Sequence, residues 1–295
     1  MFDINKIYQP KTVEEALFLR SEHPEALIIA GGSDVLLKIR NGKIAGCDLL
    51  SIQALDELRG ICMEDDGTIL IRPLTSFSHI TANPIIKKYI PVLGEAVDQI
   101  GGPQIRNIGT IGGNICNGVT SADAAPTLKA FDAELEITGS DYVRVMPYTD
   151  FNLGIFKVDL RKGEILTGIR IKKNSYTNTF GDYIKYAKRR AMDIATLGCS
   201  VNVRLSEDRQ AVDRIRVAFG VAAPTPIRAY TAEKDGNGHA VNEELFDLIA
   251  AGSVEDVSPR TSWRASKEFR IHLIKELARR ATRNSVEKAG GVLDD

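Results

Sequence analysis

The sequence predicts an α+β protein of two domains, and three observations carry this prediction. The chain has 295 residues, which is enough for about two domains of ordinary size. The N-terminal part of the chain contains short apolar runs and helical patterns. The C-terminal part contains strands followed by two helices. A polar stretch from Lys172 to Thr179 separates the parts, so we expect domains at residues 1–174 and 180–291.

The first domain is expected to begin with a helix and continue through short strands. Thr12 and Glu15 form a capping-box pattern that opens an amphipathic helix through about Ser21. A second helix should start near Thr75, and a third should run over residues 91–100. Strands are expected at residues 26–30, 48–51, 68–71, 133–138, 142–146 and 164–171.

The second domain shows strands first and helices afterwards. Residues 200–205 and 214–219 alternate apolar with polar side chains, which is typical of half-buried strands. Helices should follow at residues 242–251 and 262–283, where apolar residues recur at helical spacing. The domain is therefore expected to be a compact α+β unit.

Composition excludes several classes of function. Lys and Arg number 38 against 39 Asp and Glu, so the net charge of −1 recruits neither nucleic acid nor an anionic membrane. No apolar run is long enough for a membrane helix and the start lacks a secretory pattern, so we expect a cytoplasmic protein. The four cysteines form no CxxC pair and should be buried or half-buried free thiols rather than metal ligands. The four histidines show no metal-binding spacing.

Two Gly-Gly loops are the main candidates for a binding site. Gly31-Gly32 ends the apolar run that begins at Leu27, and Gly112-Gly113 stands inside the segment TIGGN at residues 110–114. Glycine is needed where a Cβ would block a ligand's approach or forbid the backbone dihedrals, and backbone N–H groups of a tight turn can hold a diphosphate. Each pair alone is explained better by a bulge or a turn at a strand end. Together they favour a nucleotide cofactor.

Polar side chains beside the loops extend this hypothesis. Ser33, Thr110, Asn114 and Asn117 can add hydrogen bonds to a clamped diphosphate. Asp123 can accept from the hydroxyl and amine donors of a nucleoside.

Five motifs, in order along nearly the whole chain, resemble the FAD-binding subunit of the molybdenum hydroxylases. Within that superfamily the similarity is greatest to the separate FAD subunits of bacterial xanthine dehydrogenases. The motifs are LIIAGGSDVLL, GGPQIRNIGTIGGNICNG with SADAAP, KYAKRRAMDIATLG, GVAAPTPIRA and SWRASKEFRIHLI.

The resemblance implies a two-part FAD-binding domain of the vanillyl-alcohol-oxidase type, followed by a smaller C-terminal α+β domain. It implies that both loops hold the FAD diphosphate, with Asp123 on the adenosine side, Ile165 as an apolar contact and Lys185 reaching the flavin. Arg106 and Arg190 are second choices that suit structural ion pairs equally well. The residues expected to bind FAD are Leu27, Ile28, Ile29, Ala30, Gly31, Gly32, Ser33, Asp34, Thr110, Ile111, Gly112, Gly113, Asn114, Asn117, Asp123, Ile165 and Lys185.

The implied function is electron relay. A molybdopterin-binding large subunit would oxidise the substrate, a small subunit with two [2Fe–2S] clusters would pass electrons to FAD, and the flavin would give hydride to NAD+. Relatives that use NAD+ often carry adjacent acids where this chain has only Asp193, so the acceptor stays open. A purine substrate rests on overall similarity alone. Three alternatives also stay open: a hydroxylase for another N-heterocycle such as nicotinate, a stand-alone flavoprotein oxidoreductase, and a flavin-free scaffold.

Overall fold

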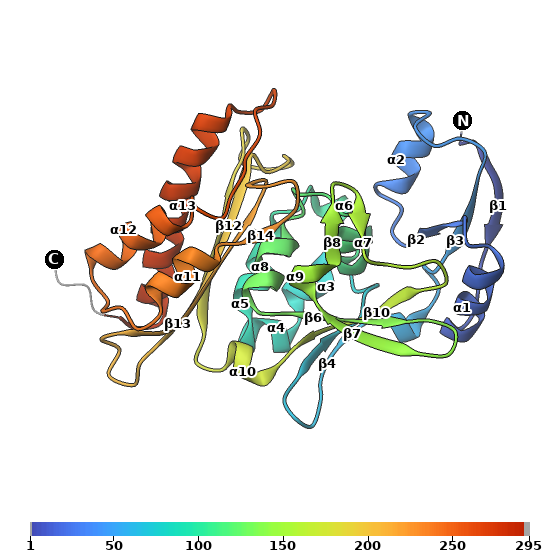
Figure 1. Cartoon of the computed structure of the whole chain (residues 1–295). Helices are drawn as coiled ribbons and strands as arrows, with labels where there is room; N and C mark the ends of the chain where they lie inside the picture. The colour runs from blue at the N-terminus through green and yellow to red at the C-terminus, as the bar shows by residue number, and fades with distance from the viewer. Residues whose placement is uncertain (1, 292–295) are drawn as a thin grey trace.

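The computed structural model describes residues 2–291. Among the described residues, the three larger of the four sheets follow one another along the molecule (Figure 1). We name the three parts the N-terminal lobe (residues 2–58), the central lobe (residues 59–179) and the C-terminal lobe (residues 180–291). The N-terminal and C-terminal lobes lie at opposite ends, so the central lobe contacts both.

The N-terminal lobe is a parallel sheet with strand order β1-β3-β2. Thr12 Oγ1 accepts from the Glu15 N–H at 3.1 Å, which confirms the predicted start of the first helix. Leu17 and Leu50 pack in one apolar cluster with Leu74 and Ile165 of the central lobe, so burial fixes the two lobes together. The elements are β1 (Ile4–Tyr8), α1 (Val13–Glu22), β2 (Leu27–Ile29), α2 (Val35–Arg40), β3 (Cys47–Ser51) and the 3₁₀ helix η1 (Asp56–Leu58).

The central lobe contains an antiparallel sheet with strand order β4-β5-β10-β6-β7, and its helices pack in one large apolar cluster with that sheet. Several of these helices are short and begin at proline, whose fixed φ suits the first helical turn. The strands are β4 (Ile61–Met63), β5 (Ile69–Ile71), β6 (Glu134–Thr138), β7 (Val143–Pro147), β8 (Asn152–Gly154), β9 (Lys157–Val158) and β10 (Ile165–Ile171). The helices are α3 (Phe77–Ala82), α4 (Pro84–Tyr89), α5 (Pro91–Asp98), α6 (Pro103–Ile108), α7 (Ile111–Cys116), α8 (Ala124–Ala130), α9 (Tyr148–Phe151) and α10 (Lys173–Tyr176).

The C-terminal lobe is an antiparallel sheet with strand order β11-β12-β13-β14, covered on its outer side by helices (Figure 1). The expected succession of strands and then helices is therefore present. The elements are β11 (Phe180–Tyr186), β12 (Leu197–Leu205), β13 (Val212–Gly220), β14 (Ile227–Arg228), α11 (Tyr230–Gly236), α12 (Glu243–Gly252) and α13 (Lys267–Lys288).

Strand β12 differs from the sequence prediction in its burial. The alternation of polar and apolar residues predicts a half-buried strand, but every residue from Leu197 to Val203 is buried. Its apolar side faces the core of the C-terminal lobe, and α8 of the central lobe covers the other side. The prediction is wrong because the covering helix comes from a distant part of the sequence.

Smaller differences have local causes. Helix α13 begins at Lys267 rather than Ser262, because Ser262 and Ala265 form a backbone bridge and Ser266 Oγ caps the Phe269 N–H. Cys62 is exposed, against the expectation of buried or half-buried thiols. Within residues 2–291, no helix is long and apolar enough to cross a membrane.

Candidate functional site

A cleft of about 550 Å³ lies between the N-terminal and central lobes, and both Gly-Gly loops line it. We call residues 27–34 the first loop and residues 110–114 the second loop. The two loops and Asn117 together contain fourteen of the residues predicted from the sequence. Twelve of these line the cleft, whereas Ile29 and Ile111 are buried in the core. The lining residues among the predicted set are Leu27, Ile28, Ala30, Gly31, Gly32, Ser33, Asp34, Thr110, Gly112, Gly113, Asn114, Asn117 and Ile165.

The first loop offers backbone donors to the cleft. It follows strand β2 and turns at Gly32, whose φ of 72° lies in the left-handed region that glycine tolerates. Among the described residues, no acceptor pairs with the backbone N–H groups of residues 31–35, since the first bond of α2 runs from Leu36 N to Gly32 O. A run of unpaired N–H groups at the edge of a cleft is a site for an anion.

Gly31 is required by packing within the protein. A Cβ at this position would lie 1.9 Å from the carbonyl oxygen of Ile108, at the end of α6. The first loop therefore rests directly on the backbone that leads into the second loop. This contact brings segments far apart in sequence to the same part of the cleft.

The second loop is the start of helix α7, which the sequence prediction did not identify. Thr110 caps the helix by accepting from the Gly113 N–H at 3.2 Å. The Ile111 and Gly112 N–H groups donate to Thr75 and Pro73 carbonyls at 3.1 Å and 2.8 Å. These donors are thus already used inside the protein. A Cβ at Gly112 would lie 2.5 Å from Pro73 Cβ, so this glycine also serves internal packing.

The backbone of the second loop offers few free donors to the cleft. Polar groups come instead from side chains of this loop and of the residues after it. Asn114 Oδ1 is buried and has no hydrogen-bond partner among the described residues. Asn117 Oδ1 accepts from Lys38 Nζ of α2 at 2.9 Å, and this bond connects the two sides of the site. Lys38 was missed by the sequence prediction because its position in a helix gives no sign of a partner 79 residues away.

Asp123 and Lys185 are not part of the cleft lining, but the structure brings them together. Lys185 Nζ donates to Asp123 Oδ2 at 2.9 Å, and the Tyr183 hydroxyl donates to Asp123 Oδ1 at 2.7 Å. Burial raises the pKa of the Asp123 carboxyl above its ordinary value, although Lys185 acts in the opposite direction. Because the two residues touch, any group that reaches one of them also lies close to the other. The family resemblance implies Asp123 on the adenosine side of FAD and Lys185 at the flavin, but the two side chains are in contact.

Arg20, Glu25 and Lys162 line another part of the cleft and were not predicted. Lys162 forms an ion pair with Glu25 across the gap between the lobes. Arg20 Nη1 donates to the Pro24 and Ala26 carbonyls, while its buried Nε has no partner among the described residues. No local pattern marks Lys162, because only the docking of the lobes brings it to Glu25.

The second-choice arginines differ from one another. Arg106 forms an ion pair with Asp98 at 3.1 Å and donates to the carbonyls of Ile100 and Gly101, so its role is structural. Arg190 is exposed.

The residues of the cleft fit an extended dinucleotide. The unpaired N–H groups of residues 31–35 suit a diphosphate. The unpartnered Asn114 Oδ1 and Arg20 Nε provide polar atoms that a ligand would satisfy. Ile28, Ile165 and other apolar residues form the walls, as is usual for cofactor sites.

Comparisons with known proteins agree along the whole chain. Residues 2–172 match the family described as FAD binding domain in molybdopterin dehydrogenase, and residues 182–285 match the CO dehydrogenase flavoprotein C-terminal domain. The chain is 40% identical over 293 residues to the xanthine dehydrogenase FAD-binding subunit of Escherichia coli O157:H7, covering 99% of this chain and 100% of that protein.

Two further relatives extend the comparison. Over 207 residues the chain is 32% identical to the nicotinate dehydrogenase FAD-subunit of Eubacterium barkeri, covering 68% of this chain and 69% of that subunit. It superposes with a TM-score of 0.91 on a chain of the solved carbon monoxide dehydrogenase from Hydrogenophaga pseudoflava, at 29% identity, covering 98% of this chain and 99% of the other.

Proposed function

The chain belongs to the FAD-binding subunits of the molybdenum hydroxylases, and on this premise we propose that it carries electrons from a partner subunit through FAD to NAD+. The resemblance seen in the sequence is confirmed, and so is the fold class of an FAD-binding domain followed by a C-terminal domain. FAD is its cofactor. When bound, FAD accepts electrons and transfers hydride, while the protein binds and orients it.

The run of unpaired N–H groups in the first loop is the observation that supports the site most directly. Residues 31–35 would donate to the FAD diphosphate, with Ser33 and Thr110 adding hydroxyl groups. Asn114 Oδ1, unpartnered in the described structure, would gain a partner from the cofactor. Asn117 would position the site through Lys38. Ile165 would be an apolar contact, and Lys185 with Asp123 would lie at the flavin end.

The proposed division into domains is 1–174 for FAD binding and 180–291 for the C-terminal domain. The proposed partners are a molybdopterin-binding large subunit and a small subunit with two [2Fe–2S] clusters, in the cytoplasm. Relatives named as subunits or medium chains of dehydrogenases support this assembly. The 40% identity to a xanthine dehydrogenase subunit over nearly the full chain favours a purine substrate over nicotinate.

NAD+ is the proposed acceptor although this chain has one acid where relatives often have two. Asp193 is held in place, because its carboxylate accepts from the Arg189 and Ile194 N–H groups at 3.0 Å and 2.9 Å. A fixed carboxylate near the flavin can still orient the amide of a nicotinamide.

The test is a visible spectrum of the purified chain, co-expressed with its partners, followed by anaerobic addition of NADH. We expect flavin bands that bleach on addition. Bands that persist would keep the FAD site and reject NAD+ as acceptor. Absence of flavin, with no binding of added FAD, would reject the proposed site and favour the scaffold alternative. Reduction of the isolated flavoprotein by a purine would instead favour a stand-alone enzyme.

A further inference from the structure

A row of buried polar side chains lies between α8 of the central lobe and β12 of the C-terminal lobe. Ser200 and Asn202 point toward α8, because the alternating residues Cys199 and Val201 belong to the core on the opposite side of the sheet. Thr127 shares a face of α8 with Asp123, four residues earlier, which contacts the same sheet. We call Thr127, Ser200 and Asn202 the interlobe seam.

The seam contains polar atoms that have no partner among residues 2–291. These are Thr127 Oγ1, Ser200 Oγ and both amide atoms of Asn202, and their residues are at most 1% exposed. Burying a polar group without a hydrogen bond costs about 1–3 kcal/mol, so several such groups side by side would be a large penalty. Ordered water that bonds to two or more of them removes the penalty.

The seam runs lengthwise along the helix. At one end Asp123 contacts Tyr183 and Lys185, which pair with Ser200 and Gly198 of β12. At the other end Asp132 contacts Arg216, which pairs with Asn202. The helical segment from Asp123 to Phe131, the residue before Asp132, advances about 12 Å. The strand from Gly198 to Asn202 advances about 13 Å. Helix and strand therefore stay together, and Thr127 lies midway.

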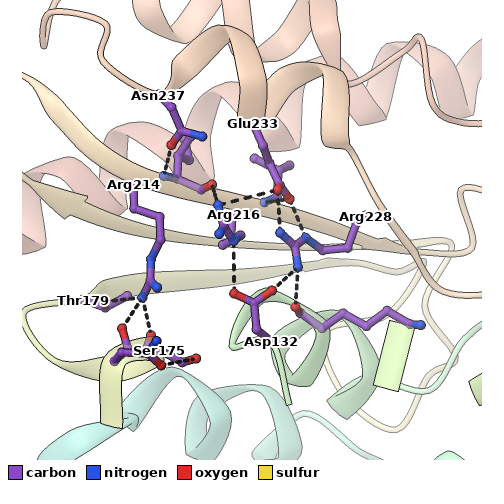
Figure 2. A network of polar contacts seen from close by, with 12 residues as sticks. Asp132, Ser175, Thr179, Arg214, Arg216, Arg228, Glu233 and Asn237 are labelled. Atoms are coloured by element: carbon purple, nitrogen blue, oxygen red, sulfur yellow. Dashed lines mark hydrogen bonds and ion pairs between the residues drawn. The ribbon is translucent and has the colours of Figure 1, made fainter. Parts of the chain in front are cut away.

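A charged network closes the second end of the seam. Figure 2 shows the Asp132 carboxylate between Arg216 and Arg228, with Arg228 also bonded to Glu233. The Asp132 side chain is 39% exposed, whereas that of Asp123 is 7% exposed. The interlobe seam thus lies between the Asp132 carboxylate, which contacts solvent, and the buried Asp123 carboxylate.

We propose that the interlobe seam binds a short chain of ordered water and conducts protons between Asp132 at the surface and Asp123. This inference rests on the proposed function, which places Lys185, and with it Asp123, at the flavin. Ser200 and Thr127 can each donate and accept a hydrogen bond, as a relay requires. Asn202 orients water from the end nearest Arg216.

The proposed reaction would use one proton in each turnover. In the proposed function, bound FAD would take up two electrons with one proton from solvent, and hydride transfer to NAD+ would remove both electrons and that proton as NADH. Asp123 is buried, so a proton that moves between it and Asp132 has to pass through the protein. The raised pKa of its carboxyl suits a group that takes up and releases a proton.

The test removes the hydroxyls of the seam in T127V/S200A, both close to isosteric, in the FAD-loaded chain. We expect the flavin content to be unchanged. After rapid photochemical reduction of the flavin, a pH-indicator dye should show proton uptake that is at least about tenfold slower than in the unchanged chain. D132N, which keeps the shape of the residue, should slow uptake in the same direction. A high-resolution crystal structure of the FAD-loaded chain should show water on Thr127, Ser200 and Asn202.

Ser285→Ala is the matched control. Its buried hydroxyl donates to Val201 O on the opposite side of β12, so its removal should leave proton uptake unchanged. Proton uptake at the normal rate in both seam variants, or a crystal structure without water in the seam, overturns the inference. In that case bound flavin would still support the proposed function. A chain that binds no FAD rejects the proposed function, and the inference with it.

Discussion

The two Gly-Gly loops look alike in sequence but differ in what their backbones offer. In the first loop the N–H groups of residues 31–35 have no acceptor within the described chain. In the second loop those of Ile111, Gly112 and Gly113 are bonded to Thr75, Pro73 and the Thr110 side chain. The first loop therefore supplies backbone donors, whereas the second builds a wall and supplies side chains. A shared glycine pattern does not imply a shared role.

The substitution Gly31→Ala should have the largest effect on this comparison. The added Cβ would meet a backbone carbonyl at 1.9 Å, and neither backbone can move without displacing the other loop. We expect the free energy of unfolding of the FAD-free chain to fall by more than about 3 kcal/mol. Thermal unfolding of the apoprotein measures it. Stability like that of the unchanged chain would show that the first loop does not rest on the Ile108 carbonyl.

Gly113→Ala should separate folding from binding. Gly113 is exposed in the cleft, and its Cβ would meet only Thr110 Oγ1 at 3.0 Å outside its own helix backbone. Alanine stabilises a helix by about 0.5–1 kcal/mol relative to glycine, so the apoprotein should not lose stability. The methyl group would occupy cofactor space, and we expect the Kd for FAD to rise at least about tenfold, or 1.4 kcal/mol. Fluorescence titration with FAD measures the Kd, and an unchanged value would place the cofactor away from the second loop.

Asn114→Leu tests the side chains that the second loop contributes. Asn114 Oδ1 has no partner in the described chain, so the apoprotein should keep its stability or gain slightly. Loss of a buried hydrogen bond to the cofactor should weaken FAD binding by about 1–3 kcal/mol. Apoprotein unfolding and FAD titration are compared. Destabilised apoprotein with normal FAD affinity would mean that Asn114 is structural.

The bond between Lys38 and Asn117 should give the smallest effect. A double-mutant cycle with Lys38→Met and Asn117→Leu should show a coupling of about 0.5–1.5 kcal/mol in FAD binding, because each residue holds the other across the site. Additive effects of the two substitutions would show that the bond does not connect the loops functionally.

The sequence predicts local features of this fold well and long-range ones poorly. The cap at Thr12 and the strands at 27–29 and 165–171 follow from patterns within a few residues. Helix α7 is not predicted because glycine and asparagine disfavour helices, whereas contacts with the distant Pro73 and Thr75 help to stabilise it. The full burial of β12 was missed because α8 belongs to another lobe.

The site shows the same division. Both loops could be recognised from their glycine pairs, because at Gly31 and Gly112 a Cβ does not fit. The contact of Asp123 with Lys185 and the places of Arg20 and Lys162 in the cleft depend on how the lobes pack. No local pattern records that packing.

Residue-resolved amide hydrogen exchange, with and without FAD, tests the central claim most directly. The account predicts that FAD slows exchange strongly at residues 31–35, whose N–H groups gain an acceptor, and changes it little at residues 111–113, which are already bonded. Protection confined to residues 111–113, or equal in the two loops, would contradict the account.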